Sequence, residues 1–539
     1  MRDFHDPAWW RNAVFYQVYV RSFADSDGDG IGDLPGITAR LPHLKSLGAD
    51  ALWITPFYTS PQHDHGYDVA DYRDIDPLFG TLADADALLA RAHRLGLKVV
   101  FDIVPNHTSS EHEWFKAALA AQPGSPERDR YLFRTGRVDG TEPPNNWTSV
   151  FGGAAWTRVG DTDQWYLHLF DSSQPDLNWR NPEVPAMFES VLRFWLDRGV
   201  DGFRIDVAHS LFKEASLRDQ VLADGEHLSD VTTINSEDGM VAPHLDDEPM
   251  WDQPEVHDVY RDWRRLLDSY DPPRMAVAEA WTSTQESMAR YVRPDELMQT
   301  FNFAWLTAPW SARAFVRVIT ETLDALEGQH SSPTWVLSNH DVKRHVTRYG
   351  GGATGLARAR AATLAMLGLP GAVYLYQGEE LGLEEVAVAP EHRQDPVWWR
   401  TGEPGRDGCR VPLPWSGTAA PFGFGPGSEQ PWIPQPSAWA ALTVEAQEGV
   451  AGSTLEFYRE ALQARKAYAD SAGEEVELVD LGDDVLTFRR GPLLVVLNCG
   501  TVPVELPDGE VVVASGPLGA TLPPDTAAWL TVELGQPGR

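Results

Sequence analysis

The chain has little cysteine, a deficit of basic side chains and no long apolar run. Its 2 cysteines, Cys409 and Cys499, form no Cys-x-x-Cys pair, which excludes a disulfide scaffold and a cysteine-ligated zinc site. No stretch of about 20 apolar residues is present, so we expect no transmembrane helix. The first residues lack the apolar core of a secretory signal peptide. Together with two unpaired thiols, this predicts a cytoplasmic protein.

The charge balance excludes several classes of partner. Against 79 Asp and Glu there are 44 Lys and Arg, a formal net charge of -35. Nucleic acids and anionic membranes attract basic surfaces, so neither is expected to bind. A small neutral ligand fits better. Some of the 21 Trp could stack on the C–H faces of sugars, although most tryptophans in any protein are simply packed. We expect a monomer or a homodimer.

Short apolar runs alternate with helical stretches, which predicts a parallel sheet with crossover helices. Eight such runs favour a (β/α)8 TIM barrel over an open doubly wound sheet. The helical pattern is clearest over Leu82–Leu95 and Val184–Arg198. The predicted strands are Ala13–Val20, Asp50–Thr55, Leu97–Val104, Gly202–Val207, Met275–Ala280, Met298–Phe303, Thr334–Ser338 and Ala372–Tyr376.

Long connections and a change of pattern divide the chain into domains. The stretch 106–175, rich in Gly, Pro, Asn and Trp, is too long for a loop and predicts an inserted small domain after strand 3. Further insertions are expected near 210–273 and 384–451. After the helix Ser453–Tyr468 the sequence changes to short alternating apolar runs. The predicted organisation is a barrel over 1–105 and 176–470, an inserted domain over 106–175 and a C-terminal antiparallel β-sandwich over 471–539.

Ionisable side chains stand where the predicted strands stop. Because parallel strands end at one mouth of a barrel, these side chains should converge there. A single acid at a strand end is usually an ion pair, and Arg204 with Asp206 could be read in this way alone. Several such groups together are costly to bury and indicate a catalytic site. The candidates are Asp206, Glu279, Asp341, Arg204, His107 and His340.

The types of these residues point to acid and nucleophile chemistry. Three acids could hold a metal ion. Against that reading, Glu279 lies in an apolar strand, where burial favours the protonated form and predicts a proton donor. Arg204 should keep Asp206 ionised. A protonated and an ionised carboxyl about 5–5.5 Å apart are typical of a retaining glycosidase.

The motifs resemble glycoside hydrolase family 13, the α-amylase superfamily, and within it the α-glucosidase and oligo-1,6-glucosidase branch. The resemblance covers nearly the whole chain. Its motifs are Asp102-Ile-Val-Pro-Asn-His107, Gln174-Pro-Asp-Leu-Asn-Trp179, Gly202-Phe-Arg-Ile-Asp206, Ala278-Glu279-Ala-Trp281 and Leu337-Ser-Asn-His-Asp341, with the flanking segments Trp9–Tyr19 and Arg406-Asp-Gly-Cys-Arg410-Val-Pro.

The resemblance implies a role for each matched residue. Asp206 would be the nucleophile that forms a β-glucosyl ester, Glu279 the acid and then base, and Asp341 the group that holds the sugar 2- and 3-hydroxyls. The implied substrate-binding residues are His107, His340, Arg204, Asp68 and Arg410, with Tyr67, Phe170 and Gln174 as further candidates. Asp68 and Arg410 would clamp the terminal glucose, which predicts an exo-acting enzyme. Each also has a simpler reading: a loop cap for His107, a turn residue for Asp68 and an ion pair for Arg410.

A second motif, Asp25-Ser-Asp27-Gly-Asp29-Gly-Ile31-Gly-Asp33, offers oxygen ligands at alternate positions with glycines between them. The resemblance implies structural Ca2+ or Mg2+ held by Asp25, Asp27, Asp29, Asp33 and the carbonyl of Ile31. The closing Glu of an EF-hand is absent. The alternative is an acidic glycine turn without metal. No organic cofactor is expected.

The expected activity is that of a retaining α-glucosidase that releases α-glucose from the non-reducing end of short α-glucosides. Val207 resembles the α-1,6-acting members, but α-1,4-acting relatives also carry Val here, and we favour α-1,4 bonds of the maltose type. An oligo-1,6-glucosidase or a transglucosylase would use the same catalytic residues. A non-catalytic relative would lack an acid and carry a membrane anchor.

Overall fold

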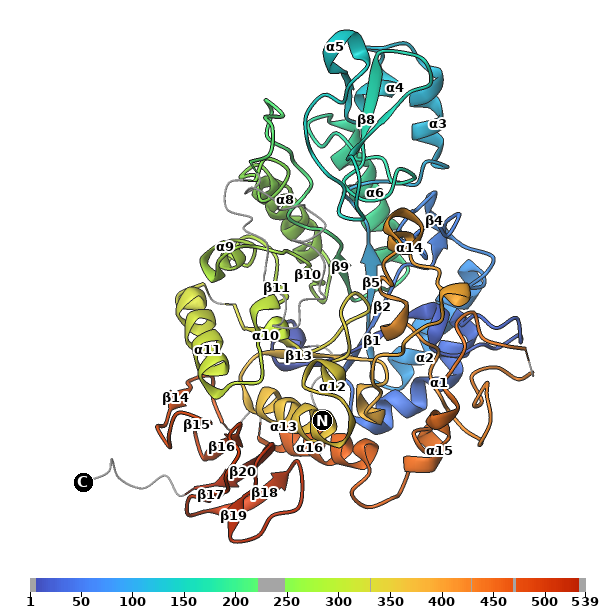
Figure 1. Cartoon of the computed structure of the whole chain (residues 1–539). Coiled ribbons are helices and arrows are strands. Elements are labelled where there is room, and N and C mark those ends of the chain that lie inside the picture. Colours follow the sequence, from blue (N-terminus) through green and yellow to red (C-terminus); the bar gives the residue numbers. More distant parts are fainter. Residues whose placement is uncertain (1–5, 222–247, 330, 428, 469–471, 533–539) are drawn as a thin grey trace.

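The computed structural model describes residues 6–221, 248–329, 331–427, 429–468 and 472–532. The middle of the predicted 210–273 insertion and the predicted boundary at 470–471 lie outside the described residues. Figure 1 shows a central barrel, an inserted domain that projects from one end of it, and a small β domain at the C-terminal end of the chain.

Eight parallel strands form the barrel, one for each predicted apolar run. They are β1 Val14–Val18, β2 Ala51–Ile54, β5 Lys98–Ile103, β9 Gly202–Ile205, β10 Met275–Ala278, β11 Gln299–Thr300, β12 Thr334–Val336 and β13 Ala372–Tyr376. Hydrogen-bonded neighbours follow the order β11-β10-β9-β5-β2-β1-β13-β12. The first and last strands of this order, β11 and β12, meet where the backbone N–H of Asn302 donates to the Thr334 carbonyl at 3.2 Å. This bond closes the ring, and the TIM barrel is confirmed.

Helices cover the strands on the outside. The longer ones are α1 Leu34–Leu47, α2 Leu82–Arg94, α6 Glu183–Asp197, α8 Val256–Asp268, α11 Ala312–Leu326, α13 Gly352–Gly368 and α16 Thr454–Tyr468. Shorter ones are α9 Gln285–Arg290, α10 Phe303–Thr307, α12 His345–Arg348, α14 Pro396–Thr401 and α15 Val444–Gln447. Local sequence sets their ends: α2 begins at a capping box of Thr81 and Asp84. The side chain of Asn302 caps α10, which is why β11 is shorter than predicted.

The inserted domain leaves the barrel after β5 and returns to it before α6. It contains α3 Glu113–Ala120, α4 Pro126–Asp129, α5 Arg137–Gly140 and the antiparallel strands β6 Phe133–Thr135, β7 Trp156–Arg158 and β8 Gln164–Leu167. A small antiparallel pair, β3 Tyr58–Thr59 and β4 Asp71–Ile75, lies in the preceding connection. The apolar cluster of the inserted domain includes Trp147, Trp156 and also Val207 of the barrel. The insertion therefore packs against the residue that follows Asp206.

The C-terminal domain is antiparallel, as predicted. Its five-stranded sheet contains β14 Glu477–Leu478, β15 Val485–Arg490, β16 Leu493–Asn498, β18 Glu510–Ala514 and β20 Thr526–Thr531, and β17 Val504–Glu505 pairs with β19 Thr521–Leu522. This domain packs against α13. The Trp529 indole N–H donates to the carbonyl of Leu364 at 2.9 Å. A Cβ on Gly368, at the end of α13, would lie 2.6 Å from Cγ2 of Val495.

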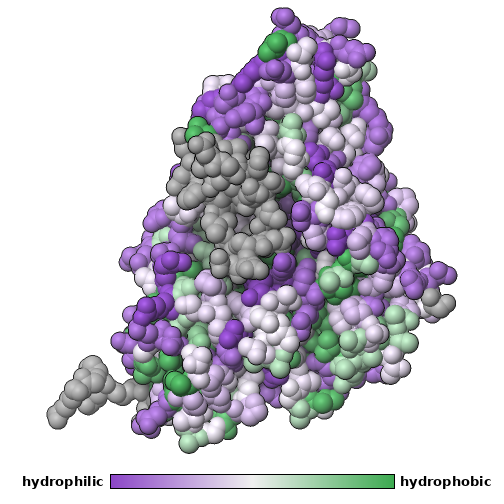
Figure 2. Space-filling model, in the orientation of Figure 1, coloured by the Kyte–Doolittle hydropathy of each residue, from purple (hydrophilic) through white to green (hydrophobic). Residues whose placement is uncertain are grey.

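The visible surface is mainly polar, with hydrophobic residues in small groups (Figure 2). Exposed large apolar side chains, such as Trp399 and Val502, are scattered among different elements. In the described part of the chain, no helix is long and apolar enough to cross a membrane.

We predict that Gly368→Ala destabilises the protein. The added methyl group overlaps Val495 at a packed interface between α13 and the C-terminal sheet, where overpacking costs about 1–3 kcal/mol. Denaturant unfolding of the variant and the wild type measures this loss. The matched control is Gly519→Ala, because a Cβ there meets nothing within 4 Å. Equal effects of the two substitutions would contradict the packing described.

Candidate active site

The ends of three neighbouring strands bring the predicted catalytic residues together. Asp102 lies in β5, Asp206 directly follows β9 and Glu279 directly follows β10. Arg204 pairs in register with Asp102 on one side and with Val277 on the other. Parallel pairing therefore places these side chains at one mouth of the barrel.

Arg204 is the centre of this cluster. Its Nη1 donates to Oδ1 of Asp102 at 2.9 Å and to Oδ1 of Asp206 at 2.6 Å. Its Nη2 lies 2.8 Å from Oε2 of Glu279. The side chain of Arg204 is 1% exposed, so these are buried, charge-assisted contacts. A single guanidinium thus contacts both the predicted nucleophile, Asp206, and the predicted acid, Glu279.

The surroundings of Asp206 do not favour its ionised form, which the sequence predicted. Complete burial, with the nearby charges of Glu279 and Asp102, raises the pKa of Asp206 well above its usual value. Arg204 acts in the opposite direction but does not outweigh them. The prediction that Asp206 stays ionised beside Arg204 is contradicted by this raised pKa. One cation is shared among several carboxyls, so each of them costs more to ionise than it would beside a cation of its own.

Glu279 is held through both of its oxygens. Oε2 accepts from the Val207 amide at 2.9 Å and forms the ion pair with Arg204. Oε1 accepts from the Trp281 indole N–H at 3.1 Å. Val207 has φ 44, which is a strained conformation for a β-branched residue. This strain occurs where its amide contacts the carboxyl of Glu279.

Asp341 lies on the other side of the mouth, among cations. Arg406 Nη1 and Arg410 Nη2 each donate to its Oδ1 at 3.0 Å. Nε2 of His340 lies 3.2 Å from its Oδ2. Burial opposes ionisation, but His340, Arg406 and Arg410 together hold the pKa of Asp341 well below its usual range. Asp341 is therefore an anion at neutral pH.

The remaining predicted binding residues lie around these acids. The Tyr67 hydroxyl donates to Asp102 at 3.0 Å, and its ring stacks on His340 with centroids 5.2 Å apart. Nε2 of His107 lies 3.1 Å from the Tyr67 carbonyl, and the His107 ring contacts Phe170. Burial lowers the pKa of His107 to about 4, so its ring is neutral and can donate or accept.

The carboxylate of Asp68 is buried and contacts its own turn. Its carboxylate accepts from the Ser60 hydroxyl and from the amides of His63 and Asp64, and its side chain is fully buried. These contacts fit the simpler reading of Asp68 as a residue that stabilises a turn. Asp64 instead faces the site: its Oδ1 accepts from Arg406 at 2.8 Å and its Oδ2 from Gln174 at 3.1 Å.

Sequence reasoning missed Asp64 and Arg406. Arg406 joins Asp64, Asp341 and Asp395 through its three nitrogens, at 2.8, 3.0 and 2.6 Å. Each missed residue lies four positions before a residue that was predicted, Asp68 and Arg410. The neighbouring positions in the same two segments could therefore have been considered, but spacing alone did not distinguish them.

The acidic loop, residues 25–33, has part of the ligand geometry that a bound cation needs. Asp25, Asp27 and Asp29 each offer an oxygen, and these oxygens lie within 4.8 Å of one another. Burial, with the charges of Asp27 and Asp25, raises the pKa of Asp29, a cost that a bound cation would relieve. Asp33 accepts from Ser26 and caps α1 through the Gly36 amide. The structure thus brings together three of the five predicted ligands.

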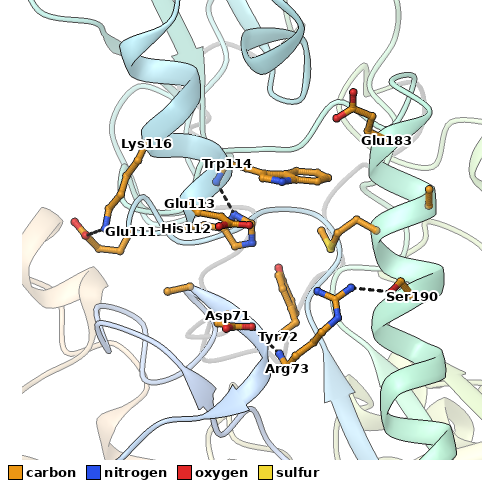
Figure 3. Close-up of a pocket in the computed structure, with 13 residues that line it drawn as sticks. Asp71, Tyr72, Arg73, Glu111, His112, Glu113, Trp114, Lys116, Glu183 and Ser190 are labelled. Atoms are coloured by element: carbon orange, nitrogen blue, oxygen red, sulfur yellow. Dashed lines mark hydrogen bonds and ion pairs between the residues drawn. The ribbon is translucent and has the colours of Figure 1, made fainter.

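A groove of about 780 Å3 lies between β4, α3 and α6 (Figure 3). None of the predicted site residues lines it. Two of its charged side chains have partners within the groove: Lys116 pairs with Glu111 at 2.6 Å, and Arg73 donates to the Ser190 hydroxyl at 3.0 Å. The groove is therefore separate from the candidate active site.

This fold and this cluster of acids define a class of protein. The model of the α-amylase catalytic domain matches residues 17–472. The chain therefore belongs to the α-amylase family of glycoside hydrolases.

Particular relatives are similar over most of the chain. A "Probable alpha-glucosidase" of Rhizobium meliloti (strain 1021) is 41% identical over 500 residues, which cover 90% of this chain and 87% of the relative. An "Oligo-1,6-glucosidase" of Parageobacillus thermoglucosidasius is 36% identical and covers 89% of this chain and 87% of its own length. Among solved structures, the alpha-glucosyl transfer enzyme XgtA has a TM-score of 0.85 at 39% identity, covering 97% of this chain and 99% of its own.

We predict that Asp206→Asn makes the protein more stable at neutral pH. The pKa of Asp206 is raised in the folded state, so its favourable contribution is present at low pH and is lost as pH rises through the folded pKa. The gain in melting temperature over the wild type should therefore increase from about pH 4 to pH 8. The exposed Asp324→Asn on α11 is the control and should show no such trend. A gain that shrinks as pH rises would contradict this assignment.

Proposed function

We propose that the protein is an exo-acting α-glucosidase that retains the anomeric configuration. The observation that carries this proposal is the pair of carboxyls, Asp206 and Glu279, bound to the two nitrogens of one buried guanidinium at the barrel mouth. Such a pair supplies a nucleophile and a proton donor to the same glycosidic bond.

The mechanism needs a single proton on the correct carboxyl. The pair retains a proton in the substrate-free site, and in the reactive form this proton resides on Glu279 while Asp206 is ionised. Asp206 attacks the anomeric carbon and forms a β-glucosyl ester, as Glu279 gives its proton to the departing oxygen. Glu279 then takes a proton from water, which attacks the ester and releases α-glucose.

Asp341 and its cations bind the terminal glucose. The anionic Asp341 accepts from the 2- and 3-hydroxyls, and these bonds strengthen as positive charge develops on the sugar ring. The neutral His107 and His340 contact further hydroxyls. Asp64 and Arg406 take the place first given to Asp68 in closing the pocket, because they contact Asp341 and Gln174 directly.

Linkage and acceptor choice are parts of the same proposal. We favour short α-1,4-linked substrates such as maltose, with Val207 beside the nucleophile as the position at which α-1,6 preference would be set. A transglucosylase is the second candidate, because it uses the same ester intermediate and because XgtA, an alpha-glucosyl transfer enzyme, shares the fold over 97% of this chain. All three acids are present, which opposes a non-catalytic role. Two free cysteines fit a cytoplasmic location.

We further propose that the acidic loop binds structural Ca2+, with Mg2+ as the alternative. Asp25, Asp27 and Asp29 would provide the side-chain oxygens, and the Ile31 carbonyl could complete the set. The bound cation would neutralise three carboxylates and stabilise the loop before α1. It lies outside the catalytic cluster and takes no part in the reaction.

The enzymatic proposal is tested with purified protein on maltose, isomaltose, sucrose and trehalose, with products resolved by anomer and by length. We expect α-glucose as the first product from maltose, because two displacements restore the configuration. Asp206→Asn should reduce turnover by more than about a thousandfold, while Asp324→Asn leaves it unchanged. β-Glucose as the first product would exclude the ester mechanism. Products longer than the substrate would favour the transglucosylase.

The metal proposal predicts a calcium-dependent melting temperature. At a hundredfold excess over Kd, a cation that binds only the folded state adds about 2.7 kcal/mol of stability. Chelation with EDTA should lower the melting temperature, and added Ca2+ should restore it. Asp27→Asn should abolish this response, while Asp161→Asn in the inserted domain should retain it. A wild type that is indifferent to both EDTA and Ca2+ would show that the loop is a turn without metal.

A further inference from the structure

The proposed acid Glu279 has a neighbour to which no role has been assigned. Trp281, two residues further along the chain, donates its indole N–H to Oε1 of Glu279 at 3.1 Å. The indole also stacks on Phe303 with centroids 3.8 Å apart and planes inclined by 2°. Phe303 is the first residue of α10. The side chain of Asn302 caps this helix, and the backbone N–H of Asn302 makes the hydrogen bond that closes the barrel. The hydrogen bond to Glu279 is thus anchored in the frame of the barrel.

The other contacts of Glu279 decide where its proton can reside. Oε2 accepts from the Val207 amide at 2.9 Å and forms an ion pair with Nη2 of Arg204, which lies 2.8 Å away. A proton on this oxygen would lie against the positive charge of Arg204, which favours the ionised oxygen. The acidic proton must therefore be on Oε1, the oxygen that Trp281 contacts.

A carboxyl oxygen has two lone-pair directions, and Trp281 occupies one of them. The proton is then left with the other. We propose that Trp281 is a positioning residue that directs the acidic proton of Glu279 toward the glycosidic oxygen. This inference rests on the proposed role of Glu279 as the acid. The indole itself acts only through that carboxyl.

The surroundings of Trp281 make the stack on Phe303 and this bond important. A cavity of about 540 Å3, lined by Trp281, Phe303 and Met288 among others, lies beside the indole. Packing therefore does not enclose the ring on every side. Its orientation depends on the stack and on the bond to Glu279.

The test is Trp281→Phe, which keeps an aromatic ring against Phe303 and removes the N–H. Maltose has a poor leaving group that needs the acidic proton, whereas p-nitrophenyl α-glucoside releases a phenolate that does not. We expect kcat/KM for maltose to fall about tenfold more than kcat/KM for the nitrophenyl substrate, a part of the ~10²–10⁴ that general acids contribute. The ratio of the two constants does not depend on the fraction of folded enzyme, so partial misfolding does not obscure it.

The ratio of the two substrates is a readout that a packing role would not change. A ratio within twofold of the wild type would overturn the proposal.

Two control variants separate the possible failures. Trp335, in β12, has another buried indole, whose N–H donates to the Pro370 carbonyl at 2.7 Å. Trp335→Phe removes this donor and should leave the ratio unchanged. Glu279→Gln should lower the ratio strongly if Glu279 is the acid. If Glu279→Gln lowers it and Trp281→Phe does not, the role of Trp281 is wrong and the enzymatic proposal stands. If neither lowers it, Glu279 is not the acid and both proposals fail.

Discussion

The Arg204 guanidinium is the interaction on which the candidate active site depends. It is buried, and it contacts Asp102, Asp206 and Glu279 at the ends of three neighbouring strands. An isolated buried carboxylate is costly, and three together repel one another. The positive charge of Arg204 lowers the cost of burying the three carboxyls, but one positive charge does not neutralise all three. The raised pKa of Asp206 is a consequence of this sharing.

A second group of cations compensates the buried charge of Asp341. Arg406 and Arg410 come from the long connection after β13, and Asp64 comes from the connection after β2. These contacts join segments that are far apart in the sequence. The mouth therefore contains a region around Arg204 in which the pKa of Asp206 is raised, and a region around Asp341 in which the pKa of Asp341 is lowered. This division of charge suits a reaction in which one carboxyl gives a proton while the others stabilise a developing cation.

Much of the architecture was predictable because strands and helices have local signatures. Each of the eight apolar runs became a barrel strand, and the helix after Thr81 begins where its capping box predicts. The strand expected over Met298–Phe303 was too long, because Asn302 caps α10 instead of continuing β11. The side-chain contacts of Asp64 and Arg406 had no comparable signature. Both lie in irregular connections, whose paths depend on the rest of the fold.

The fold class could be predicted from the pattern of apolar residues, and the candidate acids from the ionisable residues at strand ends. Periodicity indicates which residues are buried, and an ionisable group at a buried strand end is costly unless it has a partner or a function. The sharing of charge among these acids could not be predicted in this way, because it depends on contacts between distant segments. The protonation of Asp206 depends on the distances to Arg204, Glu279 and Asp102, which meet only when the barrel closes. The same is true of the bond from Trp281 to Glu279 and of the place of Asp68 in a turn. Electrostatic and hydrogen-bonding terms change within a few ångströms, and no pattern along the chain specifies positions to that precision.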